Sequence, residues 1–92
     1  MTDSTFQTTI EDNTYNGWTN YETWNVALYI NNDYGLYTLA QEIAESGGTY
    51  GDFCYMMKDL GSYKTPDGVS WTDSKIDGME VNEVFTELAE EG

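Results

Sequence analysis

Apolar residues recur at three- and four-residue spacing in four segments of the chain. This spacing places them on one side of an α-helix, which is the pattern of amphipathic helices. The positions predicted to face the core are Tyr21, Trp24, Ala27 and Leu28; Leu36, Leu39, Ala40 and Ile43; Phe53, Met56, Met57 and Leu60; and Val81, Val84, Phe85 and Leu88. The sequence therefore predicts four helices.

Polar residues and glycines mark the ends of these four helices. The pairs predicted to form capping boxes are Thr19 with Glu22, Thr49 with Asp52, and Asp77 with Glu80. Asp33 is expected to cap the second helix, directly after the first helix ends near Asn32. Gly47 with Gly48 is expected to end the second helix and Gly61 the third, because glycine commonly follows the last helical residue.

Two further segments lack a helical pattern. Residues 1–16 are polar and predict a loose N-terminal arm, with a weak strand-like alternation over residues 6–10. Residues 61–77 hold the only proline in a Pro-Asp-Gly turn, and Val69 with Trp71 would form a short strand beside it. We therefore expect a mainly α fold, a single small helical domain over residues 17–92 with a short strand pair. An α+β fold is the alternative.

The net charge of the chain gives the first indication of its function. The chain has 92 residues with 17 Asp and Glu against three Lys, no His and a net charge of −14. Negative charges in such excess repel one another within a compact domain and weaken its fold. The excess therefore calls for a reason beyond solubility. A basic partner supplies one, and surfaces that normally hold nucleic acid are the commonest source of a matching positive field. The 14 aromatic residues provide for a core despite this charge.

The acids expected to bind such a partner concentrate towards the C-terminal half. They are Glu80, Glu83, Glu87, Glu90 and Glu91 in the last helix, Asp67, Asp73 and Asp77 in the preceding loop, and Glu42 and Glu45 in the second helix. In the last helix the three- and four-residue spacing puts four glutamates on one side, about 5.4 Å apart per turn. That rise is close to the several ångströms between phosphates along a strand. The alternative is a solvated helix face.

Catalytic and cofactor chemistry is not expected. Without His, the common general base, the nucleophilic triads and imidazole metal sites are excluded. Cys54 is the only cysteine, so it cannot form an intramolecular disulfide or build a zinc site alone. The sequence predicts no metal, no cofactor and no enzyme. It also shows no signal peptide or membrane segment, which favours the cytoplasm of the host cell.

The aromatic residues leave a second interpretation open. Trp18, Trp24 and Trp71 could stack bases, but base stacking normally accompanies a basic groove, so direct nucleic-acid binding is not expected. Exposed tyrosines could instead anchor a protein partner, because tyrosine buries a large area at low entropic cost. Burial of such surface would also favour a homodimer, which the monomer charge opposes.

The segment GWTNYETWNVALYINND, residues 17–33, resembles a group of small phage and plasmid proteins. Those proteins share a W-T-N-Y-E-T-W-N-V-A-L motif and a later T-P-D-G-V, which here is Thr65 to Val69. The resemblance covers most of residues 17–91. It implies a mobile-element setting, with a bacterial host, and little about mechanism.

Setting and charge together favour a phage protein that mimics nucleic-acid phosphates and inhibits a host defence protein. Anti-CRISPR or antirestriction action is ranked first. Expected partners are CRISPR effectors, restriction enzymes, uracil-DNA glycosylase, nucleoid proteins and RNA polymerase. The alternative is a phage regulatory or assembly module that binds through aromatic residues, with acidity serving solubility. A small enzyme is the third and least favoured interpretation.

Overall fold

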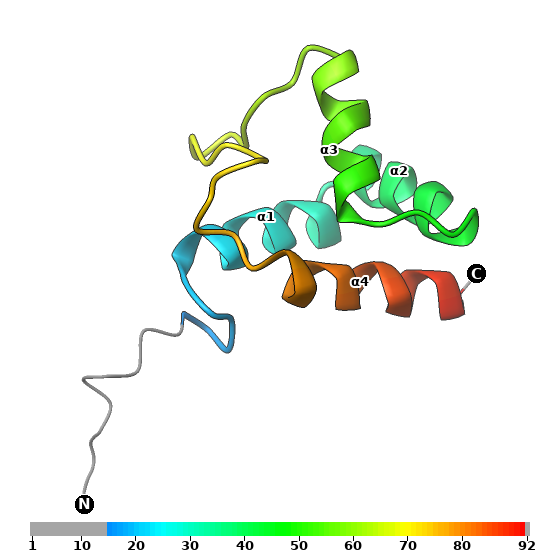
Figure 1. Cartoon of the computed structure of the whole chain (residues 1–92), viewed down its shortest axis with the longest axis horizontal. Helices are drawn as coiled ribbons and strands as arrows, with labels where there is room; N and C mark the ends of the chain where they lie inside the picture. Colours follow the sequence, from blue (N-terminus) through cyan, green and yellow to red (C-terminus); the bar gives the residue numbers. More distant parts are fainter. Residues whose placement is uncertain (1–14, 92) are drawn as a thin grey trace, which may run out of the picture.

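The computed structural model describes residues 15–91, with side chains through residue 90. It confirms a mainly α fold, with the helices α1 (Tyr21–Asn32), α2 (Tyr34–Glu45), α3 (Tyr50–Asp59) and α4 (Gly78–Glu91). In Figure 1, α1, α2 and α4 lie along the long direction of the molecule, while α3 stands across them. The expected strand over residues 6–10 and most of the expected arm, residues 1–14, lie outside the described residues.

The helix ends follow the predicted caps at α2 and α3. The Asp33 carboxylate accepts a hydrogen bond from the Leu36 amide at 3.1 Å, and the Asp52 carboxylate accepts one from the Thr49 amide at 2.9 Å. Gly47 and Gly61 follow these two helices with φ near +87° and +84°. This left-handed conformation is costly for any residue with a Cβ, so glycine ends each helix there.

The N-terminus of α1 differs from the prediction. Asn20, and not Thr19, is the N-cap, since its side-chain oxygen accepts from the Thr23 amide at 2.9 Å. Thr19 bonds to residues near α4 instead, and the Glu22 carboxylate lies 3.9 Å from the Lys75 ammonium. The Thr19–Glu22 capping box is therefore wrong, because both side chains have partners more than 50 residues away.

The buried side of α1 is also different from the predicted one. Tyr21 is exposed and Trp24 and Leu28 are only half-buried, whereas Ala27 is buried as expected. Tyr21 and Trp24 pack with Tyr15 in a separate aromatic cluster, with ring centroids 4.7 to 5.6 Å apart. The residues of α1 that are buried are Thr23, Asn25, Val26, Ala27 and Ile30.

The core forms where α1, α2, α3 and α4 meet. The predicted inward face of α4 is confirmed in full, since Val81, Val84, Phe85 and Leu88 are all buried. On α2, Ala40 is buried and the other three predicted positions pack against the core while half-buried. On α3, Phe53 and Met57 are buried, but Met56 and Leu60 are exposed, so that half of the prediction is wrong.

The loop from residue 60 to 77 descends from the end of α3 past the start of α1 before α4 begins (Figure 1). The Pro-Asp-Gly turn is confirmed by a hydrogen bond from the Gly68 amide to the Thr65 carbonyl at 2.8 Å. The strand pair is reduced to a single bridge between Lys64 and Ser70. Trp71 points into the core, and the Tyr50 hydroxyl donates to its carbonyl oxygen.

No helix within the described part of the chain is long and apolar enough to cross a membrane.

Candidate functional site

Three of the predicted partner-binding acids form an exposed row on α4. Glu83, Glu87 and Glu90 are separated by four and three residues, and all three are exposed. They lie opposite the buried face of α4, as the helical spacing predicts. We call these three residues the α4 ridge. Glu91 is the last residue of α4, and its side chain lies outside the described part.

The α4 ridge has no ion-pair partner within the described residues. The ion pair present there joins Lys75 to Glu22, away from α4. Glu83 and Glu87 are four residues apart on one helix, and Glu87 and Glu90 are three apart, so their charges repel one another. The row is therefore a set of carboxylates that cost helix stability and have no compensating contact there.

Glu80 does not belong to this exposed row. It lies in the first turn of α4, where it is half-buried and its carboxylate accepts a hydrogen bond from the Thr19 amide at 2.8 Å. It therefore holds the segment before α1 against the start of α4.

Only one of the two hydrogen bonds of the predicted Asp77–Glu80 capping box forms. The Asp77 carboxylate accepts from the Glu80 amide at 3.2 Å, but the Asp77 amide donates to Thr23 Oγ1 at 2.9 Å.

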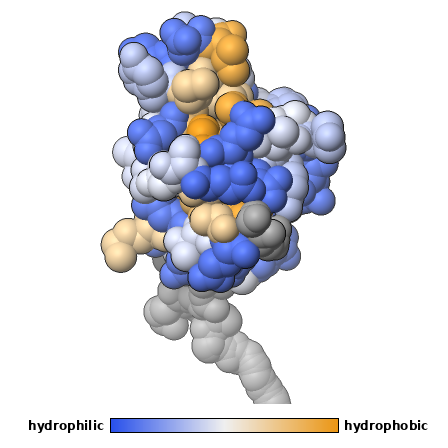
Figure 2. Space-filling view, turned by 90° about the vertical axis from the view of Figure 1, so that its right-hand side faces the viewer, coloured by the Kyte–Doolittle hydropathy of each residue, from blue (hydrophilic) through white to orange (hydrophobic). Residues whose placement is uncertain are grey.

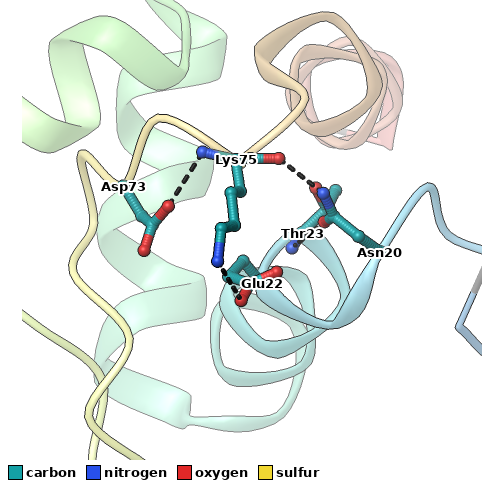
Figure 3. A network of polar contacts seen from close by, with 5 residues as sticks. All are labelled: Asn20, Glu22, Thr23, Asp73 and Lys75. Carbon is teal, nitrogen blue, oxygen red and sulfur yellow. Dashed lines mark hydrogen bonds and ion pairs between the residues drawn. The ribbon is translucent and has the colours of Figure 1, made fainter. Parts of the chain in front are cut away.

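The three loop acids also have internal hydrogen bonds. Asp77 accepts a second bond, from the Thr19 hydroxyl at 3.3 Å. The Asp73 carboxylate accepts from the Lys75 amide at 2.8 Å, and the Lys75 carbonyl accepts from Asn20 Nδ2 at 2.6 Å. Figure 3 shows this chain of contacts between the loop and the start of α1. We call Asp67, Asp73, Asp77 and Glu80 the bonded acids.

Asp67 completes a buried network that joins the loop to α1. Its carboxylate accepts from Asn25 Nδ2 at 2.8 Å, and the Asn25 oxygen accepts from the Thr65 hydroxyl at 2.6 Å. The Thr65 hydroxyl in turn accepts from the Val69 amide at 3.2 Å. Partial burial, together with a hydrogen bond to Asp67, raises the pKa of the Tyr29 phenol above its ordinary value. Asn25 and Thr65 are buried, so each needs these partners.

This network gives the two sequence motifs a structural role. Asn25 belongs to the segment over residues 17–33, and Thr65 and Asp67 belong to T-P-D-G-V. Three polar residues of the first motif, Asn20, Thr23 and Asn25, bond to residues of the loop. A polar residue in the middle of a helical pattern is the signal for such a bond, but spacing alone does not identify its partner.

Glu42 and Glu45 are exposed on α2, which packs against α4. The C-terminal ends of α2 and α4 lie at the same end of the molecule (Figure 1). Gly47 and Gly48, which follow α2, line a shallow groove together with Thr86, Ala89 and Glu90. The predicted acidic surface is therefore divided. The α4 ridge and the α2 acids are exposed near one end, and the bonded acids lie around the loop and the start of α4.

Two other kinds of site were considered, a metal site and a reactive thiol. Within the described residues, no group of three or more His, Cys, Asp or Glu converges to hold a metal ion. Cys54 is half-buried and its thiol lies 3.4 Å from the Trp71 carbonyl oxygen. Burial raises the pKa of the Cys54 thiol, which keeps the thiol protonated and weakly nucleophilic.

Sequence reasoning missed a surface beside α3. A groove of about 450 Å³ lies between α3 and the loop, lined by Cys54, Tyr55 and Lys58 on one side and by Tyr63 and Thr72 on the other. Two predicted core positions, Met56 and Leu60, are exposed on the same helix. The sequence signal was present, because apolar residues occupy more than one side of this helix.

The chain belongs to the DUF7249 family, a family of unknown function, whose model matches residues 11–91. No curated protein and no solved structure matches the chain.

Proposed function

We propose that this chain binds the basic, nucleic-acid-binding surface of a host defence protein and inhibits it by presenting carboxylates in place of phosphates. Anti-CRISPR or antirestriction action is the first candidate. The observation that carries the proposal is the α4 ridge, three exposed carboxylates without an ion-pair partner in the described residues. Repulsion between the ridge carboxylates destabilises α4 in the free chain. A positively charged partner would neutralise these carboxylates, which explains why the chain carries them.

The proposal assigns different roles to the two groups of acids. The α4 ridge supplies the central contacts, and Glu42 and Glu45 extend the surface at the end of α2. The bonded acids Asp67, Asp73, Asp77 and Glu80 add long-range negative charge but keep their internal hydrogen bonds. Each turn of α4 rises about 5.4 Å, so ridge carboxylates one turn apart can replace successive phosphates in a groove built for nucleic acid.

The proposal is tested by capture from a bacterial lysate with three versions of the full chain. One is the wild type, and the second carries Glu83→Gln, Glu87→Gln and Glu90→Gln. The third is a matched control with the same three-charge change in the first 12 residues, Asp3→Asn, Glu11→Gln and Asp12→Asn. We expect the wild type and the control to capture a nucleic-acid-binding protein at low salt and to release it when duplex DNA is added in excess.

The ridge variant should capture much less of that protein, with its helix content by circular dichroism unchanged. Raising the salt from about 50 to about 500 mM shortens the Debye length from roughly 14 to 4 Å and should release the captured protein. If the ridge variant captures as well as the control, the ridge is only a solvated face and the proposal is wrong.

The second candidate is a phage regulatory or assembly module that binds through tyrosines. The observation that favours it is the strong exposure of Tyr34, Tyr55 and Tyr63. In that case substitution of these tyrosines would abolish capture, the ridge variant would not, and added salt would leave the captured protein in place.

A further inference from the structure

A tight turn precedes α1. Tyr15 and Trp18 exchange two backbone hydrogen bonds across it, since each amide donates to the other residue's carbonyl, at 2.7 and 2.8 Å. Asn16 and Gly17 form the turn with φ of +50° and +89°, and Asn16 is the one residue other than glycine with positive φ in the described part of the chain. Two-residue turns with positive φ at both positions favour the pair Asn-Gly.

The turn positions an aromatic cluster that lies apart from the core. The Tyr15 ring centroid lies 5.3 Å from that of Tyr21 and 4.7 Å from that of Trp24, both on α1. In Figure 1 the turn belongs to the blue segment that leads into α1. Figure 2 looks onto the other end of the molecule, where α2 and α4 end, and shows mostly hydrophilic surface below α3. The Tyr15 ring therefore keeps its place only while the turn keeps its length.

The two turn residues also form a reactive pair. The carboxamide carbon of an asparagine can be attacked by the backbone nitrogen of the next residue, which closes a five-membered ring, and asparagine is among the thermolabile residue types. A following glycine has no Cβ to crowd the attacking nitrogen. Of the asparagines in the chain, Asn16 alone is followed by glycine.

The structure leaves the attacking nitrogen and its target unrestrained. Asn16 and Gly17 are exposed, and in the residues that the structure describes the Asn16 carboxamide has no hydrogen-bond partner and the Gly17 amide has no acceptor. Beyond its chain neighbours, no described atom lies within 4 Å of the point where a side chain on Gly17 would begin. Asp67 and Gly68 form a comparable pair, but both take part in hydrogen bonds within the protein.

We propose that Asn16 and Gly17 are a self-modification site, where Asn16 is converted to isoaspartate and the turn then releases Tyr15 from the aromatic cluster. The Gly17 nitrogen gives its proton to hydroxide and attacks Cγ of Asn16. A C–N bond forms, the bond from Cγ to the carboxamide nitrogen breaks, and that nitrogen takes a proton from water and leaves as ammonia. Water then opens the ring at either carbonyl, giving aspartate or isoaspartate. One water is consumed and one ammonia is released, with no oxidation or reduction.

The two products affect the turn differently. Isoaspartate routes the backbone through Cβ, so the turn gains a methylene group, and the two hydrogen bonds between Tyr15 and Trp18 cannot both be kept. Tyr15 then loses its place against Tyr21 and Trp24. Aspartate at position 16 adds a negative charge and leaves the length of the backbone unchanged. The reaction needs only water, so it goes beyond the proposed target binding and does not depend on it.

The test follows the folded full chain during incubation in neutral and in alkaline buffer, by mass spectrometry of its proteolytic peptides. We expect the mass gain of replacing NH2 by OH at residue 16, with a several-fold higher rate in alkaline buffer, because the attacking nitrogen must be deprotonated. Asn31 is the control in the same sample, since it is also exposed but lies within α1 and precedes an asparagine. The proposal is wrong if Asn16 stays unconverted or converts no faster than Asn31.

A second measurement tests the release of Tyr15. The isoaspartate form, separated by chromatography, should show a shifted indole N–H signal for Trp24 in its NMR spectrum, while the signal of Trp71, buried in the core, stays in place. The variant Asn16→Asp carries the same added charge on an unchanged backbone and should keep both wild-type signals. An unchanged Trp24 signal in the isoaspartate form, or an equal shift in Asn16→Asp, would contradict the release of Tyr15 by a longer turn.

Discussion

The α4 ridge and the bonded acids differ in what surrounds their carboxylates. Glu83, Glu87 and Glu90 are exposed and have no ion-pair partner in the described residues, whereas every bonded acid accepts at least one hydrogen bond from the protein itself. Both groups look alike in the sequence, as acids in the C-terminal half. The four bonded acids therefore help to hold the loop and the start of α4 in place, whereas the three ridge acids make no such bond in the described residues.

Among the substitutions around the bonded acids, Asn25→Ala is expected to lower the stability of the fold most. Asn25 is fully buried and bonds to both Thr65 and Asp67, so its removal leaves the buried Thr65 hydroxyl with one partner fewer. We expect a loss of about 2 to 4 kcal/mol in the free energy of unfolding. Urea denaturation followed by circular dichroism measures it. Asn31→Ala, at an exposed position of the same helix, is the control, and equal losses in the two variants would contradict the network's role.

The loop is held from its other side by Tyr50, which gives a pH-dependent prediction. The Tyr50 hydroxyl donates to the Trp71 carbonyl, and burial, with a smaller effect of the neighbouring Cys54, raises the pKa of this phenol above its ordinary value of 10.0. The folded state therefore keeps the proton longer than the unfolded state does. The stability from this group is complete below pH 10.0 and is lost as the pH rises above that value, by about 1.4 kcal/mol per pH unit.

Urea denaturation between about pH 8 and 11 should show this loss in the wild type and a flatter profile in Tyr50→Phe. Tyr34→Phe, at a strongly exposed tyrosine, should keep the wild-type profile. Parallel profiles for Tyr50→Phe and the wild type would show that the buried phenol does not govern alkaline unfolding.

A direct contrast between the two groups of acids is Asp77→Ala against Glu83→Ala. Asp77 bonds to the Glu80 amide at the start of α4, so its loss should cost about 1 kcal/mol, as the loss of a helix cap does. Asp77→Asn keeps an acceptor and should cost less. Glu83→Ala removes a repulsion with Glu87 and should change stability by less than about 0.5 kcal/mol. Thermal unfolding of the three variants measures these differences. If Asp77→Ala were as stable as Glu83→Ala, the bonded acids and the ridge acids would not differ in their contribution to stability.

The smallest effect concerns the α4 ridge alone. Added salt should stabilise the wild type by screening its self-repulsion, and the three Gln substitutions at Glu83, Glu87 and Glu90 should reduce that gain by about 0.5 kcal/mol. Urea denaturation at low and high salt measures the difference. Identical salt responses in the two proteins would indicate that the ridge charges do not sense one another.

Most of the fold could be predicted because its signals are local. Asp33, Thr49 and Asp52 cap helices through residues three positions away, and Val81 to Leu88 follow one helical period. The buried side of α1 could not be predicted in this way. It includes the polar Thr23 and Asn25, whose partners lie in the loop and at Asp77, and the larger Tyr21 and Trp24 pack outside the core instead.

The candidate site shows the same limit. Helical spacing correctly placed Glu83, Glu87 and Glu90 together and exposed, but it also included Glu80, whose bond to Thr19 spans 61 positions. The charge of Asp67 and Asp77 was evident from the sequence, but the bonds of their carboxylates to Asn25 and Thr19 depend on how the loop folds back on α1. Long-range bonds of this kind cannot be read from helical spacing.

The most direct test of the central claim measures the affinity of the captured nucleic-acid-binding protein for the wild type and for the ridge variant over a series of salt concentrations. For the wild type, the logarithm of the binding constant should fall linearly with the logarithm of salt concentration, and duplex DNA should compete for the same surface. In the ridge variant the slope should be shallower by about two to three, because three charges no longer take part. An affinity that does not change with salt, or equal slopes in the two proteins, would contradict the account.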